Sequence, residues 1–129
     1  MDPRSLARYS LAGIRLVNGV AALAAPQVVA RRLGADEHQP GLVHVLRMFG
    51  VRTVFIGAEL LLLKDADRIA RALRIGTLIH ASDALSAAAA GRHGMLPPRA
   101  AMTTTAISTV NVVLSLLAQL PEGTRRGHT

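Results

Sequence analysis

Hydrophobic residues gather in four stretches along the chain, over residues 9–30, 41–63, 73–91 and 100–120. Each stretch is about as long as the roughly 20-residue helix that crosses the apolar core of a bilayer. Short polar connectors separate them, and no run alternates apolar and polar residues as a strand would. Because short connectors join antiparallel neighbours, the pattern predicts an all-α, transmembrane four-helix bundle with up-down-up-down topology, in a single domain over residues 1–129.

Proline, aspartate and glycine mark the ends of the predicted helices. Pro26 lies inside the first stretch, where its ring and missing N–H should kink or end the helix. Pro40 and the Pro97–Pro98 pair should begin the second and fourth helices, because proline is tolerated in a first turn. The remaining predicted boundaries are the C-cap glycine Gly34, an N-cap at Asp65 or Asp67, and a C-terminal stop at Gly91 or Gly94.

Composition favours a membrane over water as the surroundings of these helices. Charged residues make up 18% of the chain, below the roughly 25% of a typical soluble domain. The stretch 100–120 contains no ionisable residue, whereas a water-facing helix needs a charged face. A soluble four-helix bundle is the alternative reading. A cleaved signal peptide is a further alternative, but Arg15 and Asn18 interrupt its apolar run.

The residue types that are missing exclude several kinds of site. The chain has no Cys and no Trp, which excludes a disulfide scaffold, a thiolate metal site and a catalytic cysteine. The net charge of +7 comes from arginines dispersed along the chain, and only 2% of residues are aromatic. Nucleic acid is therefore not the expected partner, since that function needs a basic patch or a stacking platform. We expect no cofactor.

Basic residues are distributed unequally between the two sets of connectors, which predicts the orientation in the membrane. The N-terminus, the second connector and the C-terminus contain eight, against four in the other two connectors. Positive residues stay inside, so both termini should face the cytosol, in a multi-pass protein of the cell membrane. The eight are Arg4, Arg8, Lys64, Arg68, Arg71, Arg74, Arg125 and Arg126.

Each predicted span has one polar face, which in lipid must turn toward the other helices. In the last span this face consists of Thr104, Ser108, Asn111, Ser115 and Gln119, spaced three or four residues apart. The helical rise places Asn18, Arg52, His80, Asp83 and Asn111 near the membrane centre, Arg15 and Glu59 in the cytosolic half, and Arg47 in the outer half. We therefore predict that Arg15 pairs with Glu59 and Arg52 with Asp83, with Asn18 and Asn111 completing the hydrogen bonds.

The intramembrane charges do not balance, and the excess suggests a ligand. Three arginines face two carboxylates, and a charge left unpaired in a membrane costs about 3 kcal/mol. A surplus cation attracts an anionic or oxygen-rich group, which Arg52 and Arg47 would hold. The predicted partner is thus a lipid or a lipophilic small molecule. The ligand-binding candidates are Arg52, Arg47, Arg15, Asn18 and Asn111.

Two other functions fit the same residues. A carboxyl group in an apolar site can act as a general acid, so Glu59 and Asp83, with His80 as proton partner, are candidates for isomerisation or cyclisation of an isoprenoid-like substrate. Alternatively the polar strips only hold the helices together, and the chain is an accessory subunit that docks a membrane partner or a second copy of itself. His80 and Asp83 have no further ligand residues around them, so no metal site is predicted.

One short motif resembles a known family. The segment Arg47-Met48-Phe49-Gly50-Val51-Arg52, followed by Gly57, resembles a pattern in DoxX-like and related small bacterial membrane proteins, mostly of unknown function. Pro26, Leu33-Gly34 and Asp83 are similar too. The resemblance implies a multi-pass protein with four helices. Some DoxX-type proteins are associated with redox partners, but a chain without Cys gives no support for thiol redox work.

Overall fold

The computed structural model describes residues 1–121, which form five helices and no strand. The helices are α1 (Pro3–Ala24), α2 (Pro26–Arg32), α3 (Pro40–Leu62), α4 (Ala66–Arg92) and α5 (Pro98–Ala118). The prediction of an all-α fold is confirmed, and the four predicted stretches correspond to five helices.

The additional helix arises at Pro26. Helix α1 ends at Ala24 and α2 begins at Pro26, with a bend of 108° between them. Proline at the first position of α2 has no N–H to continue the α1 hydrogen bonds. The predicted break is confirmed, and the residues of the predicted span 9–30 are divided between α2 and α1, which already begins at Pro3.

Helix α4 also begins earlier than its apolar stretch. The side chain of Asp65 accepts a hydrogen bond from the backbone N–H of Asp67 (3.0 Å), which caps the helix at Ala66. Residues 66–72, predicted to lie mostly in a polar connector, are therefore the first turns of α4, in which Ile69 and Ala72 pack against the hydrophobic core. At the other end Gly94, with a φ of +69°, terminates the helix, as Gly34 does after α2 with a φ of +74°.

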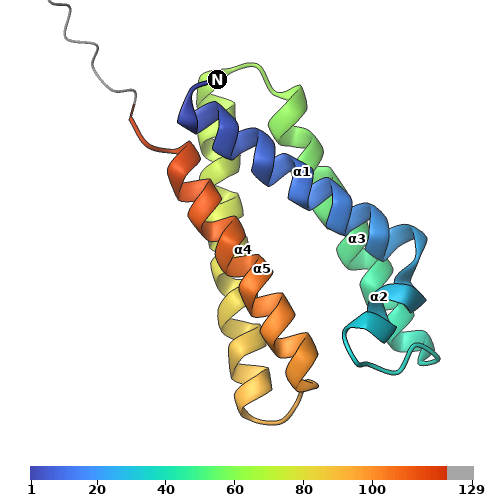
Figure 1. Cartoon of the computed structure of the whole chain (residues 1–129). Coiled ribbons are helices and arrows are strands. Elements are labelled where there is room, and N and C mark those ends of the chain that lie inside the picture. The colour runs from blue at the N-terminus through green and yellow to red at the C-terminus, as the bar shows by residue number, and fades with distance from the viewer. Residues whose placement is uncertain (122–129) are drawn as a thin grey trace, which may run out of the picture.

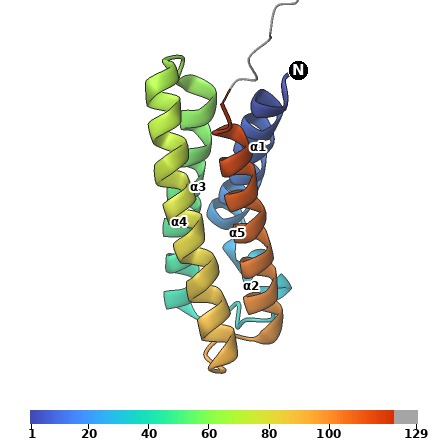
Figure 2. The same ribbon diagram turned by 90° about the vertical axis from the view of Figure 1, so that its left-hand side faces the viewer.

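The four long helices alternate in direction but form two pairs rather than a closed bundle (Figures 1 and 2). Helix α1 packs mainly on α3, and α4 packs mainly on α5. Contacts between α1 and α5 join the two pairs, whereas α3 and α4, although consecutive, touch each other little. The order in space is thus α3, α1, α5, α4.

Glycines allow the backbones of α1 and α3 to approach each other closely. A Cβ atom on Gly50 would lie 2.7 Å from the carbonyl oxygen of Gly19 and 2.7 Å from the backbone nitrogen of Leu23. A Cβ on Gly19 would lie 2.7 Å from the backbone nitrogen of Val54. Backbone therefore meets backbone here, as in the small-residue interfaces of membrane helices.

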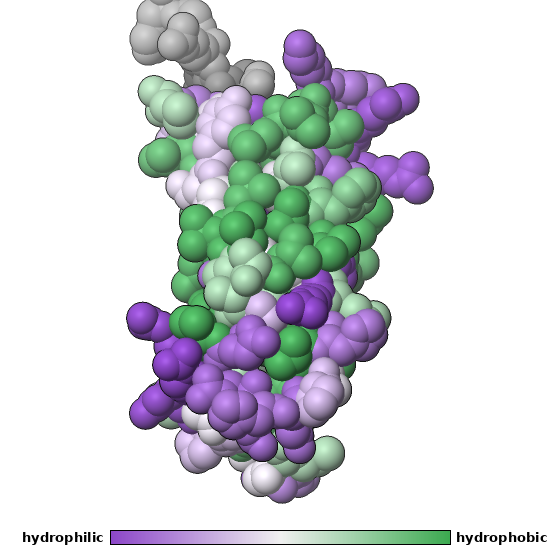
Figure 3. Space-filling model, turned by 90° about the vertical axis from the view of Figure 1, so that its right-hand side faces the viewer, coloured by the Kyte–Doolittle hydropathy of each residue, from purple (hydrophilic) through white to green (hydrophobic). Residues whose placement is uncertain are grey.

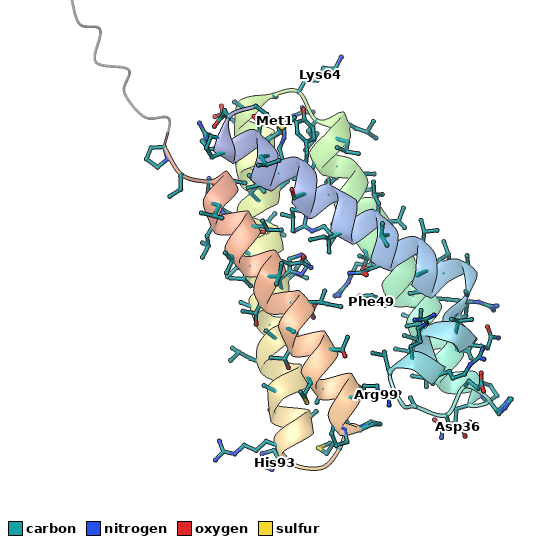
Figure 4. The ribbon with its side chains drawn as sticks, viewed as in Figure 1. Met1, Asp36, Phe49, Lys64, His93 and Arg99 are labelled. Carbon is teal, nitrogen blue, oxygen red and sulfur yellow. The ribbon has the colours of Figure 1, made fainter. Side chains whose placement is uncertain are left out.

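The polar connections lie at two opposite ends of the molecule. Met1 and Lys64 lie together at one end, and Asp36, His93 and Arg99 lie at the other (Figure 4). This is the arrangement that the alternating connectors predict. Arg125 and Arg126, which also entered the prediction of orientation, lie outside the described residues.

Length and composition alone identify one helix of the described part that could cross a membrane. This is α5, with a mean hydropathy of 1.5 in its most apolar segment. Helices α1 and α2 satisfy the same test only when taken together across their bend.

Candidate functional site

The described residues show an inverted distribution of polarity. The hydrophobic core contains three leucines, Leu11, Leu60 and Leu73, and its other members are alanines. The buried polar residues are Arg15, Thr53, His80, Ser108, Asn111 and Ser115. Every long helix exposes large hydrophobic side chains, and Figure 3 shows an apolar zone across the middle of one face, with polar residues gathered at the end of the α2–α3 connection.

Helix α5 shows this inversion most clearly. Ser108, Asn111 and Ser115, from the predicted polar face, are buried against the other helices. Met102 is 73% exposed and Leu116 is 52% exposed on the outer side. The prediction that this polar strip turns inward is confirmed.

The largest fully buried side chain is that of Arg15, which is 1% exposed. Its Nε donates a hydrogen bond to Nε2 of His80 (3.0 Å), and its Nη1 donates one to the carbonyl oxygen of Ile56 (3.2 Å). Its Nη2 is buried and has no hydrogen-bond partner among the described residues. One arginine of α1 thus connects α3 and α4 and keeps one guanidinium nitrogen, Nη2, without an acceptor in the described part of the chain.

Glycines on the two neighbouring helices make room for this arginine. A Cβ on Gly76 of α4 would lie 2.5 Å from Nη2 of Arg15. A Cβ on Gly57 of α3 would lie 2.9 Å from Cβ of the same arginine. The guanidinium therefore lies directly against the backbone of α4, one turn before His80.

The hydrogen bond from Arg15 fixes the form of His80. An arginine can only donate, so Nε2 of His80 must present its lone pair and the ring proton must be on Nδ1. His80 is 5% exposed and is held as a neutral imidazole. The same lone pair is what a metal would need, and no group of three or more His, Cys, Asp or Glu in the described residues could hold a metal ion.

A second polar contact joins α3 to α4 next to the first. Nη2 of Arg52 lies 3.1 Å from Oδ2 of Asp83, with side chains 46% and 29% exposed. The guanidinium of Arg52 also lies over the ring of Phe49, 5.5 Å from its centroid. The predicted pair of Arg52 and Asp83 is confirmed. We call Arg15, Arg52, His80 and Asp83 the central cluster.

Two predictions about hydrogen bonding are wrong. Arg15 makes no ion pair with Glu59, because its guanidinium reaches past α3 to His80, while Glu59 lines a groove between α3 and α4. Asn18 is half-buried and makes no hydrogen bond with another described side chain, and Oδ1 of the buried Asn111 has no partner there. Neither asparagine completes the cluster.

The other candidate residues are placed as follows. Arg47 is exposed on α3, without a hydrogen bond or ion pair to the described residues. Asp83 is engaged by Arg52, and the Nε2 atom of His80 is engaged by Arg15. Among the three catalytic candidates, the carboxyl group of Glu59 is the one without such a contact in the described part of the chain.

The contact between Arg15 and His80 could not be found from helix faces alone. Their helices, α1 and α4, are neither consecutive nor packed against each other, and only the long arginine side chain joins them. The signal that did exist is Gly76, which shares a face with His80 and leaves space at the right height. A glycine one turn before a buried histidine marks room for a large neighbour.

The central cluster can offer hydrogen-bond donors within an apolar surface. Nη2 of Arg15, the buried nitrogen of the cluster that has no hydrogen-bond partner among the described residues, suits an oxygen acceptor or an anion. Comparison of the chain with known protein families, with curated proteins and with solved structures finds no match.

Proposed function

We propose that this chain is a multi-pass protein of the cell membrane whose central cluster binds the oxygen-bearing end of a lipophilic small molecule. The inverted polarity supports the membrane part. A soluble domain of this size buries most of its large aliphatic side chains, whereas here most of them are exposed, around a core that consists of three leucines together with alanines and polar residues such as Arg15 and Asn111. Lipid is the solvent in which such a surface is stable.

The lengths of the helices agree with this placement. Helices α1, α3, α4 and α5 have 22, 23, 27 and 21 residues. At a rise of 1.5 Å per residue they extend over about 31 to 40 Å, enough for a hydrocarbon core of about 30 Å. Most charges that lower the hydropathy of α3 and α4 lie toward the helix ends or in the central cluster, where Arg52 and Asp83 are paired with each other.

The buried cation Arg15 carries the ligand part of the proposal. Its guanidinium has no carboxylate within ion-pair distance in the described part of the chain, and Nη2 lacks an acceptor. A buried cation that has no ion-paired carboxylate and keeps one guanidinium nitrogen without an acceptor is costly, so an oxygen-bearing ligand would gain by meeting it. The exposed Leu, Val and Ile side chains around the cluster would contact the apolar remainder of the ligand, with Arg52 and Arg47 as further contacts for its polar end.

Native mass spectrometry of the wild-type chain, extracted from membranes in mild detergent, tests this function. We expect the chain to carry a stoichiometric lipophilic adduct that contains oxygen, and the adduct mass identifies its class. A chain that is bare after gentle extraction, while an unrelated lipid-binding protein retains its ligand in the same detergent, would contradict the proposal.

A further inference from the structure

A groove of about 520 Å³ opens between α3 and α4, where these two helices touch little. Ile56 and Glu59 line it from α3, and Arg68, Arg71, Ile75 and Ile79 line it from α4. Its volume is in the range of about 300–1,000 Å³ that is typical of small-molecule sites.

Charge and hydrophobicity are separated along the length of this groove. Because α3 and α4 are antiparallel, Arg68 and Arg71 lie near the connection that contains Lys64, while Ile56 and Ile79 lie at the inner end. Glu59 lies between them. The charged mouth is thus at the end of the molecule where basic residues predominate, and the apolar part extends toward its middle.

The charged side chains of the mouth are largely unused by the protein. Arg71 makes no hydrogen bond or ion pair with the described residues, and neither does the half-buried Glu59. The nearest carboxylate oxygen to Nε of Arg68, on Asp65, is 3.9 Å away and exposed. The charged residues that line the groove in the described part of the chain are two arginines and one glutamate, so its wall has one net positive charge, which complements a single anionic group.

We infer that this groove binds a single-chain anionic membrane lipid whose head is held at the charged mouth, away from the central cluster. The inner end of the groove adjoins the cluster, because Ile56 and Gly76, which line it, also contact Arg15. Arg68 and Arg71 hold the phosphate of the lipid head. Glu59 accepts a hydrogen bond from an uncharged hydroxyl beside that phosphate, and its negative charge rejects a second anion at that point. The acyl chain lies on Ile75 and Ile79 and follows the groove inward.

Two features favour this occupant over others. The groove runs alongside one pair of helices and has one apolar track, which suits one acyl chain. If the four long helices span the membrane as proposed above, the mouth of the groove lies at the level of the lipid phosphates. In this respect the inference rests on the proposed function. A water-soluble anion would leave the isoleucines of the groove uncovered.

The test uses the full chain in detergent and 1-oleoyl lysophosphatidylglycerol as the probe, which has one negative charge and free hydroxyls. We expect Arg71→Gln to weaken binding about tenfold, the effect of losing one charge-assisted contact. Arg74→Gln is the matched control, because Arg74 is exposed on the same helix and does not line the groove. Its affinity should equal that of the wild type.

Two further arms separate the head from the tail. Lysophosphatidylcholine, which has no net charge, should bind more weakly than the probe, and Ile79→Trp should block the groove without removing any charge. Equal weakening by Arg71→Gln and Arg74→Gln, or equal binding of both lipids, would overturn the inference by showing unspecific attraction.

Native mass spectra of the same variants, recorded without added lipid, distinguish this inference from the proposed function. The adduct of the central cluster should persist in Arg71→Gln. Absence of that adduct from the wild type would count against the central site alone, whereas failure of the added probe to bind a chain that retains the adduct would overturn the groove alone.

Discussion

Replacing Gly50 by alanine is expected to separate α1 from α3 and to lower the thermal stability of the chain strongly. The added methyl group would lie 2.7 Å from a carbonyl oxygen and from a backbone nitrogen of α1. Overpacking costs about 1–3 kcal/mol where side chains can adjust, and here the obstacles are backbone atoms that cannot move alone. We expect an effect at the upper end of this range, seen as a lower midpoint when helicity is followed by circular dichroism during heating in detergent.

Gly13→Ala is the matched control for this substitution. Gly13 lies in α1 as well, but a Cβ there would meet nothing within 4 Å. Alanine should stabilise the helix by about 0.5–1 kcal/mol because it restricts the unfolded chain more than glycine does. If Gly50→Ala proved as harmless as Gly13→Ala, the close packing of α1 on α3 would be wrong.

Replacing Arg15 by methionine is expected to abolish the bound adduct while the fold persists. Methionine is flexible and apolar and fills most of the space of the arginine stem, and it leaves no buried charge behind. The substitution removes two hydrogen bonds, to His80 and to Ile56, and we expect this loss to be offset because it also removes a buried cation that has no carboxylate within ion-pair distance in the described part of the chain. We expect a melting temperature within a few degrees of that of the wild type and no adduct in native mass spectra.

The control for Arg15→Met is Arg74→Met, which removes the same charge from an exposed position of α4. This variant should keep both the adduct and the melting temperature. A large loss of stability in Arg15→Met, with the adduct retained, would mean that Arg15 holds the three helices together and binds no ligand.

Local chemistry allowed much of the fold to be predicted. Pro26 breaks the first helical stretch because proline has no backbone N–H to continue the hydrogen bonds of a helix, whatever its surroundings in the fold. The polar strip of α5 turns inward because its polar groups are more stable against the other helices than on an apolar outer surface. It consists of Ser108, Asn111 and Ser115. The capping candidate Asp65 marked the start of α4 correctly, whereas the apolar stretch began seven residues later because the first turns of α4 contain several charged residues.

The candidate site was predictable only in part, because one of its contacts joins consecutive helices and the other joins helices that are far apart in the sequence. Arg52 and Asp83 could be paired because they lie at similar depth on two consecutive helices. The partner of Arg15 depends on the order α3, α1, α5, α4 and on the space over Gly76. Both are properties of the assembled helices. The helical rise placed Arg15 and Glu59 in the same half of the membrane, so the sequence favoured Glu59 as the partner of Arg15.

Cysteine accessibility in intact cells tests the membrane placement most directly, because the native chain contains no cysteine. Lys64 and His93 are exposed and lie at opposite ends of the molecule (Figure 4). We expect a membrane-impermeant maleimide to label His93→Cys in intact cells and to label Lys64→Cys only after permeabilisation. Protection of both cysteines until lysis, with the chain recovered in the soluble fraction, would contradict a protein that spans the membrane.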